Sequence, residues 1–103
     1  MQFKSLSLML TGLFLLSGTA FADAEAGKAK ASMCAGCHGA QGVSGSDVIP
    51  NLAGQKKGYL VVAIKAYKEK TRTNGMMNGM VAGLSDQDIE NLADHFSGLT
   101  PGH

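Results

Sequence analysis

The amino-acid sequence predicts a small all-α domain, and three segments lead to this prediction. Residues 24–37 are rich in Ala and Lys, which favour helices. Residues 56–70 place apolar side chains at helical spacing, with lysines on the other side. Residues 85–97 combine a helix start signal with an apolar stripe, so three helices are expected along the chain.

The first helix is expected to run from Ala24 to Cys37. The segment that follows, Gly39 to Gly54, is dominated by Gly and Ser and contains Pro50. These residues favour turns over regular structure, so this segment is expected to be a loop.

The helix expected over residues 56–70 has a competing interpretation. The run from Tyr59 to Ile64 is β-branched enough to form a strand. The length of the whole segment and its polar end, Lys65 to Lys70, favour the helix.

The last helix has the clearest boundaries. Ser85 to Asp88 resembles a capping box in which Asp replaces the usual Glu or Gln, and Leu84 and Ile89 stand where a hydrophobic staple would pair. Gly98 and Pro101 are expected to end the helix. Its apolar stripe consists of Ile89, Leu92, Ala93 and Phe96.

Two glycine-rich loops separate these helices, over 39–54 and over Thr71 to Gly83. The second loop carries three methionines, Met76, Met77 and Met80. Unstructured loops longer than about 12 residues are uncommon in a small domain unless they are functional. The core is therefore expected to contain something other than side chains.

The N-terminus has the features of a secretory signal. Lys4 gives the start a positive charge, residues 6–16 are mostly apolar, and Ala20-Phe21-Ala22 is a small-x-small cleavage pattern. The apolar run is shorter than the about 20 residues of a membrane span. Residues 1–22 are expected to be a cleaved signal peptide and 23–103 the exported domain, with an uncleaved anchor as the alternative.

The charges exclude one class of partner. Lys4 is the single basic residue of the signal, so the exported domain has equal numbers of acidic and basic side chains and no net charge with His neutral. Nucleic-acid binding requires a strongly basic face and is not expected. Residues 56–72 are nonetheless basic and the last helix is acidic. Solvated helix faces explain most of this asymmetry, and a dipole that orients the protein toward a redox partner is the alternative interpretation.

The stretch Cys34-Ala-Gly-Cys37-His38 contains the residues that could bind a cofactor or a metal ion. A C-x-x-C pair serves dithiol redox exchange, zinc binding or covalent haem attachment. No strand pattern surrounds this pair, as a thioredoxin-like site requires, and no second ligand pair is available for zinc. On a helix, Cys34 and Cys37 share one face and His38 lies beside them, so C-x-x-C-H favours one covalently bound haem c per chain, with His38 reaching its iron.

These residues resemble those of class I c-type cytochromes, a helical fold with long loops wrapped around one covalent haem. The resemblance covers essentially all of 23–103, and it is strongest to small bacterial periplasmic members and to the single-haem halves of two-haem periplasmic cytochromes. It rests on three motifs: Cys34 to Gly39, Ile49 to Gln55, and Leu84 to Asp88 with Leu92, Ala93 and Phe96.

The resemblance implies a set of site residues. Cys34 and Cys37 would form the thioethers, His38 would bind iron, and the Pro50 carbonyl would accept a hydrogen bond from His38 Nδ1. A methionine would be the sixth ligand. In the two-haem relatives it lies seven residues before the Leu that precedes the helix cap, here Leu84, which favours Met77.

Two further methionines remain candidates. Relatives with shorter loops place the ligand nearer the cap, which would favour Met80, and Met76 is the third candidate. The resemblance also implies that Gly27 admits the ring of Phe96 where the first and last helices cross.

The function that follows is electron transport. The resemblance implies a periplasmic, non-enzymatic electron carrier with His/Met-ligated haem. Such a carrier passes single electrons between membrane or periplasmic partner proteins of a respiratory chain. It has no stable membrane insertion once the signal is removed. The alternative is a haem-based sensor or peroxidase-like protein with an open iron site. The nearby methionines argue against it, and a sulfur-to-iron absorption band distinguishes the two.

Overall fold

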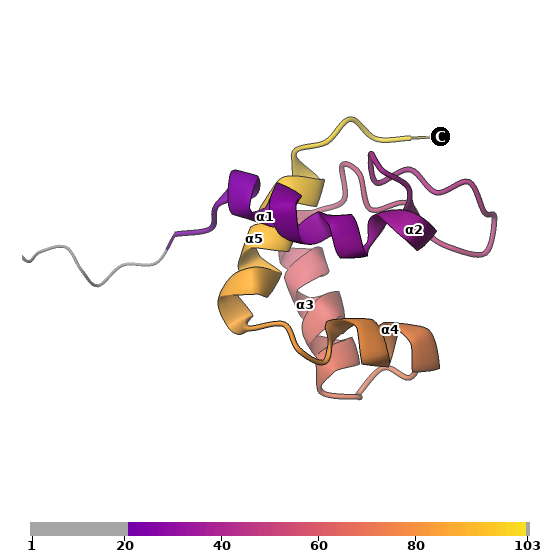
Figure 1. Cartoon of the computed structure of the whole chain (residues 1–103), viewed down its shortest axis with the longest axis vertical. Coiled ribbons are helices and arrows are strands. Elements are labelled where there is room, and N and C mark those ends of the chain that lie inside the picture. The colour runs from indigo at the N-terminus through magenta and orange to yellow at the C-terminus, as the bar shows by residue number, and fades with distance from the viewer. Residues whose placement is uncertain (1–20, 103) are drawn as a thin grey trace, which may run out of the picture.

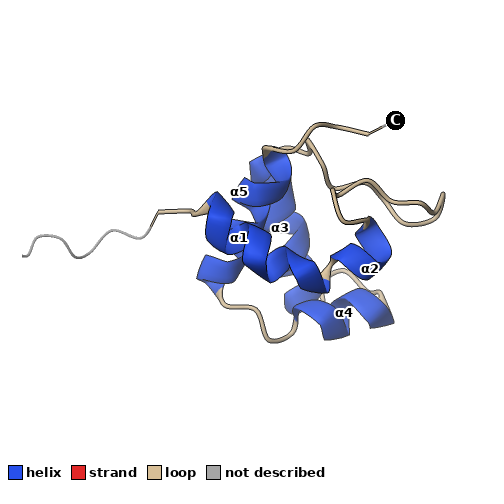
Figure 2. Ribbon diagram, turned by 45° about the horizontal axis from the view of Figure 1, so that its top comes forward, coloured by secondary structure: helices blue, strands red, loops and turns tan. Residues whose placement is uncertain are grey.

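The computed structural model describes residues 21–102, and within that range all regular structure is helical (Figures 1 and 2). Nearly all of the expected signal peptide, residues 1–20, lies outside the described residues, as does His103. Between residues 21 and 102, no helix has the length and apolar character needed to cross a membrane.

The helices follow the expected order. They are α1 (Ala24–Lys30), the 3₁₀ turn η2 (Ala31–Met33), α2 (Ala35–His38), α3 (Lys57–Lys68), α4 (Gly75–Val81) and α5 (Asp86–Ser97). The all-α class is confirmed, and α3 is a helix where a strand was the competing interpretation. The continuous helix expected over residues 24–37 is instead broken by η2 just before Cys34.

The prediction that residues 71–83 form a loop was wrong for α4. The Asn74 side chain caps this helix by accepting a hydrogen bond from the Met77 backbone N–H, 3.0 Å away. The Asn78 side chain donates to the backbone carbonyls of Tyr67 and Arg72, at 2.7 and 2.9 Å. Gly in a helix interior costs about 1 kcal/mol relative to Ala, so the glycines suggested a loop. Capping and contacts with α3 outweigh that cost.

The core forms where α5 meets α1 and α3 (Figure 1). The whole predicted stripe of α5 is buried, and Ile89 and Leu92 are the largest fully buried side chains of the described chain. Leu84 is buried as well, as expected of a staple residue. Burial of such side chains contributes about 1.5–3 kcal/mol each, which makes α5 the main packing element.

The capping box of α5 is present. The Ser85 side chain accepts from the Asp88 backbone N–H and the Asp88 carboxylate accepts from the Ser85 backbone N–H, both at 3.0 Å. The hydrogen bond from the Ser85 backbone holds the pKa of Asp88 below its ordinary value. The start of α5 is therefore stabilised above the ordinary pKa of Asp, and this contribution is lost as the pH falls through the lowered pKa.

Gly27 lies where α1 crosses α5, as expected. A Cβ on Gly27 would overlap the backbone carbonyl of Asn91 and lie 2.9 Å from the His95 Cβ, so the backbone of α5 itself requires a small residue there. The Phe96 ring lies against Gly42, whose added Cβ would be 3.2 Å from Cδ1 of that ring. Gly42 has φ +73°, so the loop needs a glycine there for two reasons.

Replacing Gly27 by Ala is expected to destabilise the haem-loaded protein by about 2–3 kcal/mol, because the new methyl group meets a helix backbone that cannot rotate away. Gly58→Ala in α3 is the matched control, since nothing lies within 4 Å of its added Cβ. The control is expected to stabilise the protein by about 0.5–1 kcal/mol through helix propensity. Denaturant unfolding measures both, and equal effects would contradict the proposed close crossing.

Candidate cofactor site

The motif from Cys34 to His38 forms a single helical turn. Cys34 is the N-cap residue of α2, and the His38 backbone N–H donates to the Cys34 carbonyl at 2.9 Å. Gly39, at φ +87°, then turns the chain away, and a Cβ there would overlap the Val43 carbonyl. Neither cysteine takes part in a disulfide within the described chain, and Cys34 is half-buried whereas Cys37 is exposed.

The imidazole of His38 is fixed by one hydrogen bond. Its Nδ1 lies 2.8 Å from the Pro50 carbonyl oxygen, the contact that the family resemblance implies. Because a carbonyl can only accept, Nδ1 carries the proton and Nε2 keeps a free lone pair. The ring is buried, with 7% exposure. A buried, oriented imidazole with a free Nε2 is suited to bind a metal ion.

The loop that carries Pro50 is held in place by backbone hydrogen bonds. Leu52 and Ala53 donate to the Gly42 carbonyl at 2.8 and 3.0 Å, and Gly54 donates to the Phe96 carbonyl at 2.9 Å. The loop therefore closes on itself and is tied to the end of α5. These bonds explain how a segment without helix or strand can position a carbonyl against His38.

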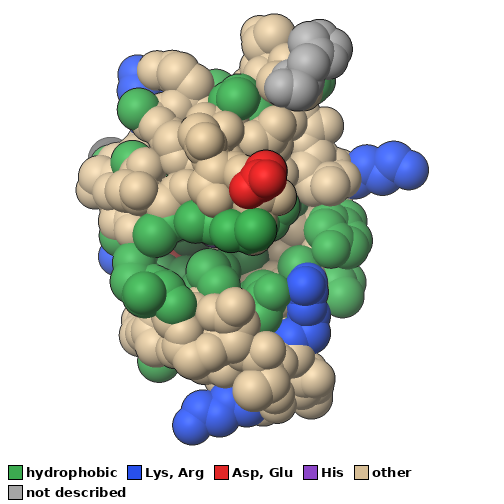
Figure 3. Space-filling model, turned by 90° about the vertical axis from the view of Figure 1, so that its right-hand side faces the viewer, with side chains coloured by type: hydrophobic (Ala, Val, Ile, Leu, Met, Phe, Trp, Pro, Cys, Tyr) green, Lys and Arg blue, Asp and Glu red, His purple; other side chains and the backbone are tan. Residues whose placement is uncertain are grey.

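The thiols and the imidazole open into a cavity of about 570 Å³. Figure 3 shows this hollow as a cleft rimmed by hydrophobic side chains, on the side of the molecule where α2 and α4 lie in Figure 1. Most of its wall is apolar and comes from the C-x-x-C-H turn, the Pro50 loop, α3, α4 and the core face of α5. Representative residues are Cys34, His38, Pro50, Leu60, Ile64, Tyr67, Met77, Met80 and Leu92.

The three candidate methionines all line this cavity from α4. Met76 is 66% exposed, whereas Met77 and Met80 are partly buried and pack against the core. Positions three apart share one helix face, so Met77 and Met80 project toward the same side. The structure thus brings the thioethers to the cavity that holds the C-x-x-C-H turn.

The charges of the cavity are few. Among its lining residues in the described chain, Arg72 alone bears a permanent charge, and its guanidinium carbon lies 4.5 Å from the centre of the Tyr67 ring. Burial, and then the neighbouring Cys37, raise the pKa of Cys34. The raised pKa is in keeping with a wall that is mostly apolar.

These residues fit a haem group. The volume lies in the range of about 300–1,000 Å³ that is usual for small-molecule and cofactor sites. Two reduced thiols, one oriented imidazole and soft thioethers meet in a largely apolar space, which are the donors of a covalent c-type haem with His/Met ligation. In residues 21–102, no cluster of three or more His, Cys, Asp or Glu residues could hold a metal ion such as zinc on its own.

Sequence reasoning missed part of the cavity wall. Arg72 and Tyr59 were not singled out as site residues, although both line the cavity. The spacing of Leu60, Ile64 and Tyr67 indicated one helix face and would have pointed to the wall of α3. Tyr59 lies in the first turn of α3, at helical spacing from Ala63 and Tyr67, so the same period would have pointed to it. The position of Arg72 depends on where α3 ends and on the unforeseen α4, so no local signal reveals it.

The chain resembles known proteins over most of its length. A family model described as cytochrome c matches residues 24–100. The chain is 44% identical over 92 residues to cytochrome c4 of Pseudomonas aeruginosa, which covers 89% of this chain and 44% of that protein. It is 42% identical over 78 residues to cytochrome c-554(548) of Halomonas halodenitrificans, covering 73% of this chain and 94% of the relative.

A solved structure agrees with these sequence matches. The cytochrome c4 structure of Acidithiobacillus ferrooxidans, described as supporting a complex-induced tuning of electron transfer, superposes with a TM-score of 0.71 at 29% identity, covering 81% of this chain and 53% of that chain. The chain thus spans about half the length of its cytochrome c4 relatives. Together with the match over residues 24–100, these similarities show that the chain belongs to the cytochrome c family, whose cofactor is a covalently bound haem c.

Proposed function

We propose that this protein is a periplasmic electron carrier that uses one covalent haem c with His/Met ligation. The observation that carries the proposal is a single apolar cavity lined by the C-x-x-C-H turn and by the methionines of α4. The solved cytochrome c4 relative, whose description refers to electron transfer, supports the same function. When bound, the haem iron supplies one-electron oxidation and reduction.

The side chains have separate roles in this proposal. Cys34 and Cys37 form the two thioethers, and His38 binds iron through Nε2. The Pro50 carbonyl orients the His38 ring and raises its basicity, since it accepts the Nδ1 proton at 2.8 Å. Met77 is the proposed sixth ligand, because it is partly buried where Met76 is exposed and because its position before Leu84 matches the resemblance.

The rest of the cavity keeps water away from the cofactor. Core side chains of α3 and α5 form the back of the cavity, and Leu60, Leu92 and Phe96 are at most 3% exposed. A thioether and an apolar wall favour ferrous over ferric iron, because they stabilise extra positive charge poorly. The protein therefore tunes the reduction potential of the haem, which agrees with the role of an electron carrier.

The proposed partners are redox proteins, with a membrane or periplasmic donor and acceptor in a respiratory chain. Val48, Tyr59 and Met76 lie at the cavity and are at least 50% exposed, so they form an apolar mouth suited to brief docking. Export rests on the proposed signal peptide over residues 1–22, and residues 23–103 are the proposed working domain. Neither nucleic-acid binding nor stable membrane insertion belongs to the proposal.

Carbon monoxide binding tests the carrier against the alternative, a sensor or peroxidase-like protein with an open iron site. The purified ferrous protein is expected to keep its absorption spectrum when carbon monoxide is added, because a bound methionine blocks the sixth position. The ferric protein is likewise expected to show no turnover of peroxide. A rapid spectral change with carbon monoxide, together with peroxide turnover, would replace the carrier by the open-site protein.

A further inference from the structure

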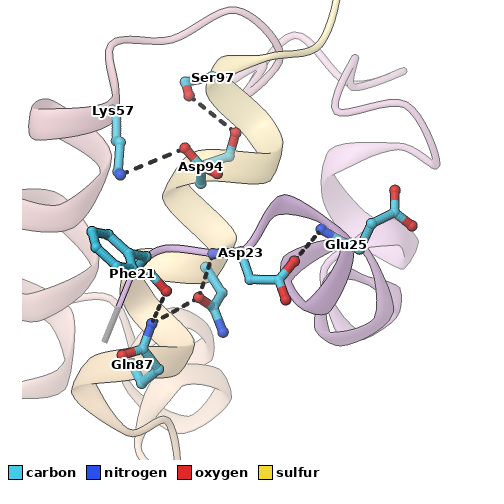
Figure 4. A network of polar contacts seen from close by, with 8 residues as sticks. Phe21, Asp23, Glu25, Lys57, Gln87, Asp94 and Ser97 are labelled. Atoms are coloured by element: carbon cyan, nitrogen blue, oxygen red, sulfur yellow. Dashed lines mark hydrogen bonds and ion pairs between the residues drawn. The ribbon is translucent and has the colours of Figure 1, made fainter. Parts of the chain in front are cut away.

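The amide of Asn91 is a buried polar group on α5, where this helix meets the residue that precedes α1. Only 9% of Asn91 is exposed, and His38 is the one other polar residue of the described chain that is buried. Its Oδ1 accepts two hydrogen bonds, from the Asp23 backbone N and from Gln87 Nε2, both at 2.9 Å. Figure 4 shows Asp23 and Gln87 converging on this side of α5.

The residues before Asp23 are held at the same place. Gln87 Nε2 also donates to the Phe21 carbonyl at 3.1 Å (Figure 4). Asp23 follows the Ala20-Phe21-Ala22 pattern, where the signal is expected to be removed. Hydrolysis there breaks the Ala22–Asp23 peptide bond, and water supplies the oxygen to the Ala22 carboxylate and protons to the Asp23 nitrogen. The nitrogen that meets Asn91 then becomes an α-ammonium group, since α-amino groups have a pKa of about 7.7–8.0.

We propose that Asn91 Oδ1, oriented by the hydrogen bond from Gln87 Nε2, is a capture site on α5 for the α-ammonium group of Asp23, an inference that rests on the proposed removal of residues 1–22. A charged donor makes a stronger hydrogen bond to the same oxygen than the amide that it replaces. The carboxylate of Asp23 accepts from the Glu25 and Ala26 backbone N–H groups at 2.9 and 3.2 Å. The Asp23 carboxylate offsets the positive charge of the α-ammonium group, which the helix dipole would otherwise disfavour at the start of α1.

The capture site connects the mature N-terminus to the haem-bearing segment. Asn91 holds Asp23 through its side chain, and its backbone carbonyl is the group against which Gly27 packs. The same α1 continues through η2 to Cys34. Asn91 and Gln87 are therefore positioning residues, which fix α1 on α5 so that the C-x-x-C-H turn meets the cavity.

Competitive acylation of the exported holoprotein at pH 7 tests the proposal. N-terminal sequencing is expected to give Asp23 as the first residue. Peptide mass spectrometry then gives the acylation rate of the α-amino group relative to Lys28, an exposed residue of the same helix. In Asn91→Ala this ratio is expected to rise about fivefold over the wild-type protein, because the ammonium group loses its acceptor.

Two further variants separate capture from general loosening of α1. Asn91→Asp keeps the size of the side chain and adds a negative charge, so its ratio is expected to stay at or below the wild-type value; a rise to the Asn91→Ala level contradicts capture. Gln87→Ala is expected to raise the ratio about twofold, because Asn91 loses the hydrogen bond from Gln87 Nε2 that orients its amide. This variant replaces Asn91→Ala as the test if Asn91→Ala does not fold. An unchanged ratio in these Ala variants, or a first residue other than Asp23, overturns the proposal. Acylation does not depend on electron transfer, so such a failure leaves the carrier function standing.

Discussion

Met77→Ala is expected to abolish the sulfur-to-iron absorption band of the ferric protein and to lower its reduction potential. The physical reason is that a thioether stabilises ferrous iron, and water or another ligand that replaces it does so less. The expected decrease is on the order of 0.1–0.2 V, a part of the range of about 0.8 V that axial ligands span. Visible spectroscopy and an electrochemical titration of the purified variant measure both effects.

Met80→Ala and Met76→Ala are the matched controls, since all three methionines lie on α4 and line the same cavity. Both controls are expected to keep the band. Met80→Ala removes partly buried packing and is expected to cost about 2–3 kcal/mol of stability, whereas Met76→Ala, at a largely exposed position, should cost little. Loss of the band in Met80→Ala with its retention in Met77→Ala would assign the sixth ligand to Met80.

The double variant Cys34→Ala with Cys37→Ala is expected to be largely unfolded as well as free of covalent haem. A cavity of about 570 Å³ remains when the cofactor is absent. At about 24 cal/mol per Å³, a closed and dry cavity of this size would cost about 14 kcal/mol, as much as the whole stability of a typical domain. Water can enter this open cleft and lowers that cost, but the core of a domain this small supplies only about 3–5 kcal/mol of stability.

Circular dichroism and a haem stain after denaturing electrophoresis measure the outcome for the double variant. No stained band and no cooperative thermal transition are expected. Ser32→Ala is the control in the same stretch of chain, because its exposed side chain lies outside the cavity and bonds only the Ala29 carbonyl in the described chain. A cooperative transition in the haem-free variant would show that the side-chain core is sufficient by itself.

The sequence predicts those parts of the fold that depend on local signals. The capping box at Ser85 and the buried stripe of α5 follow from residue type and period alone, and both are present. Helix α4 could not be predicted in this way. Its glycines disfavour a helix, and the hydrogen bonds from Asn78 to Tyr67 and Arg72 that secure it exist only after α3 has ended and the chain has turned back.

The same distinction applies to the site. The spacing of Cys34, Cys37 and His38 is a local property, and one helical turn is enough to bring the three side chains together. The contact between His38 and Pro50 was expected only from the family resemblance, because the loop that forms it has no period to read. That Gly27 meets the Asn91 backbone was not expected, since which residue of α5 faces it depends on the angle at which two helices cross.

An optical redox titration of the purified exported protein tests whether it carries electrons on a covalent haem with His/Met ligation. One one-electron transition is expected, with a low-spin spectrum in both oxidation states and the sulfur-to-iron band present only in the ferric form. The colour is also expected to stay with the polypeptide after acid acetone extraction. A high-spin ferric spectrum without that band, or colour that leaves the chain on extraction, would contradict a carrier built on covalent haem with His38 and a methionine as ligands.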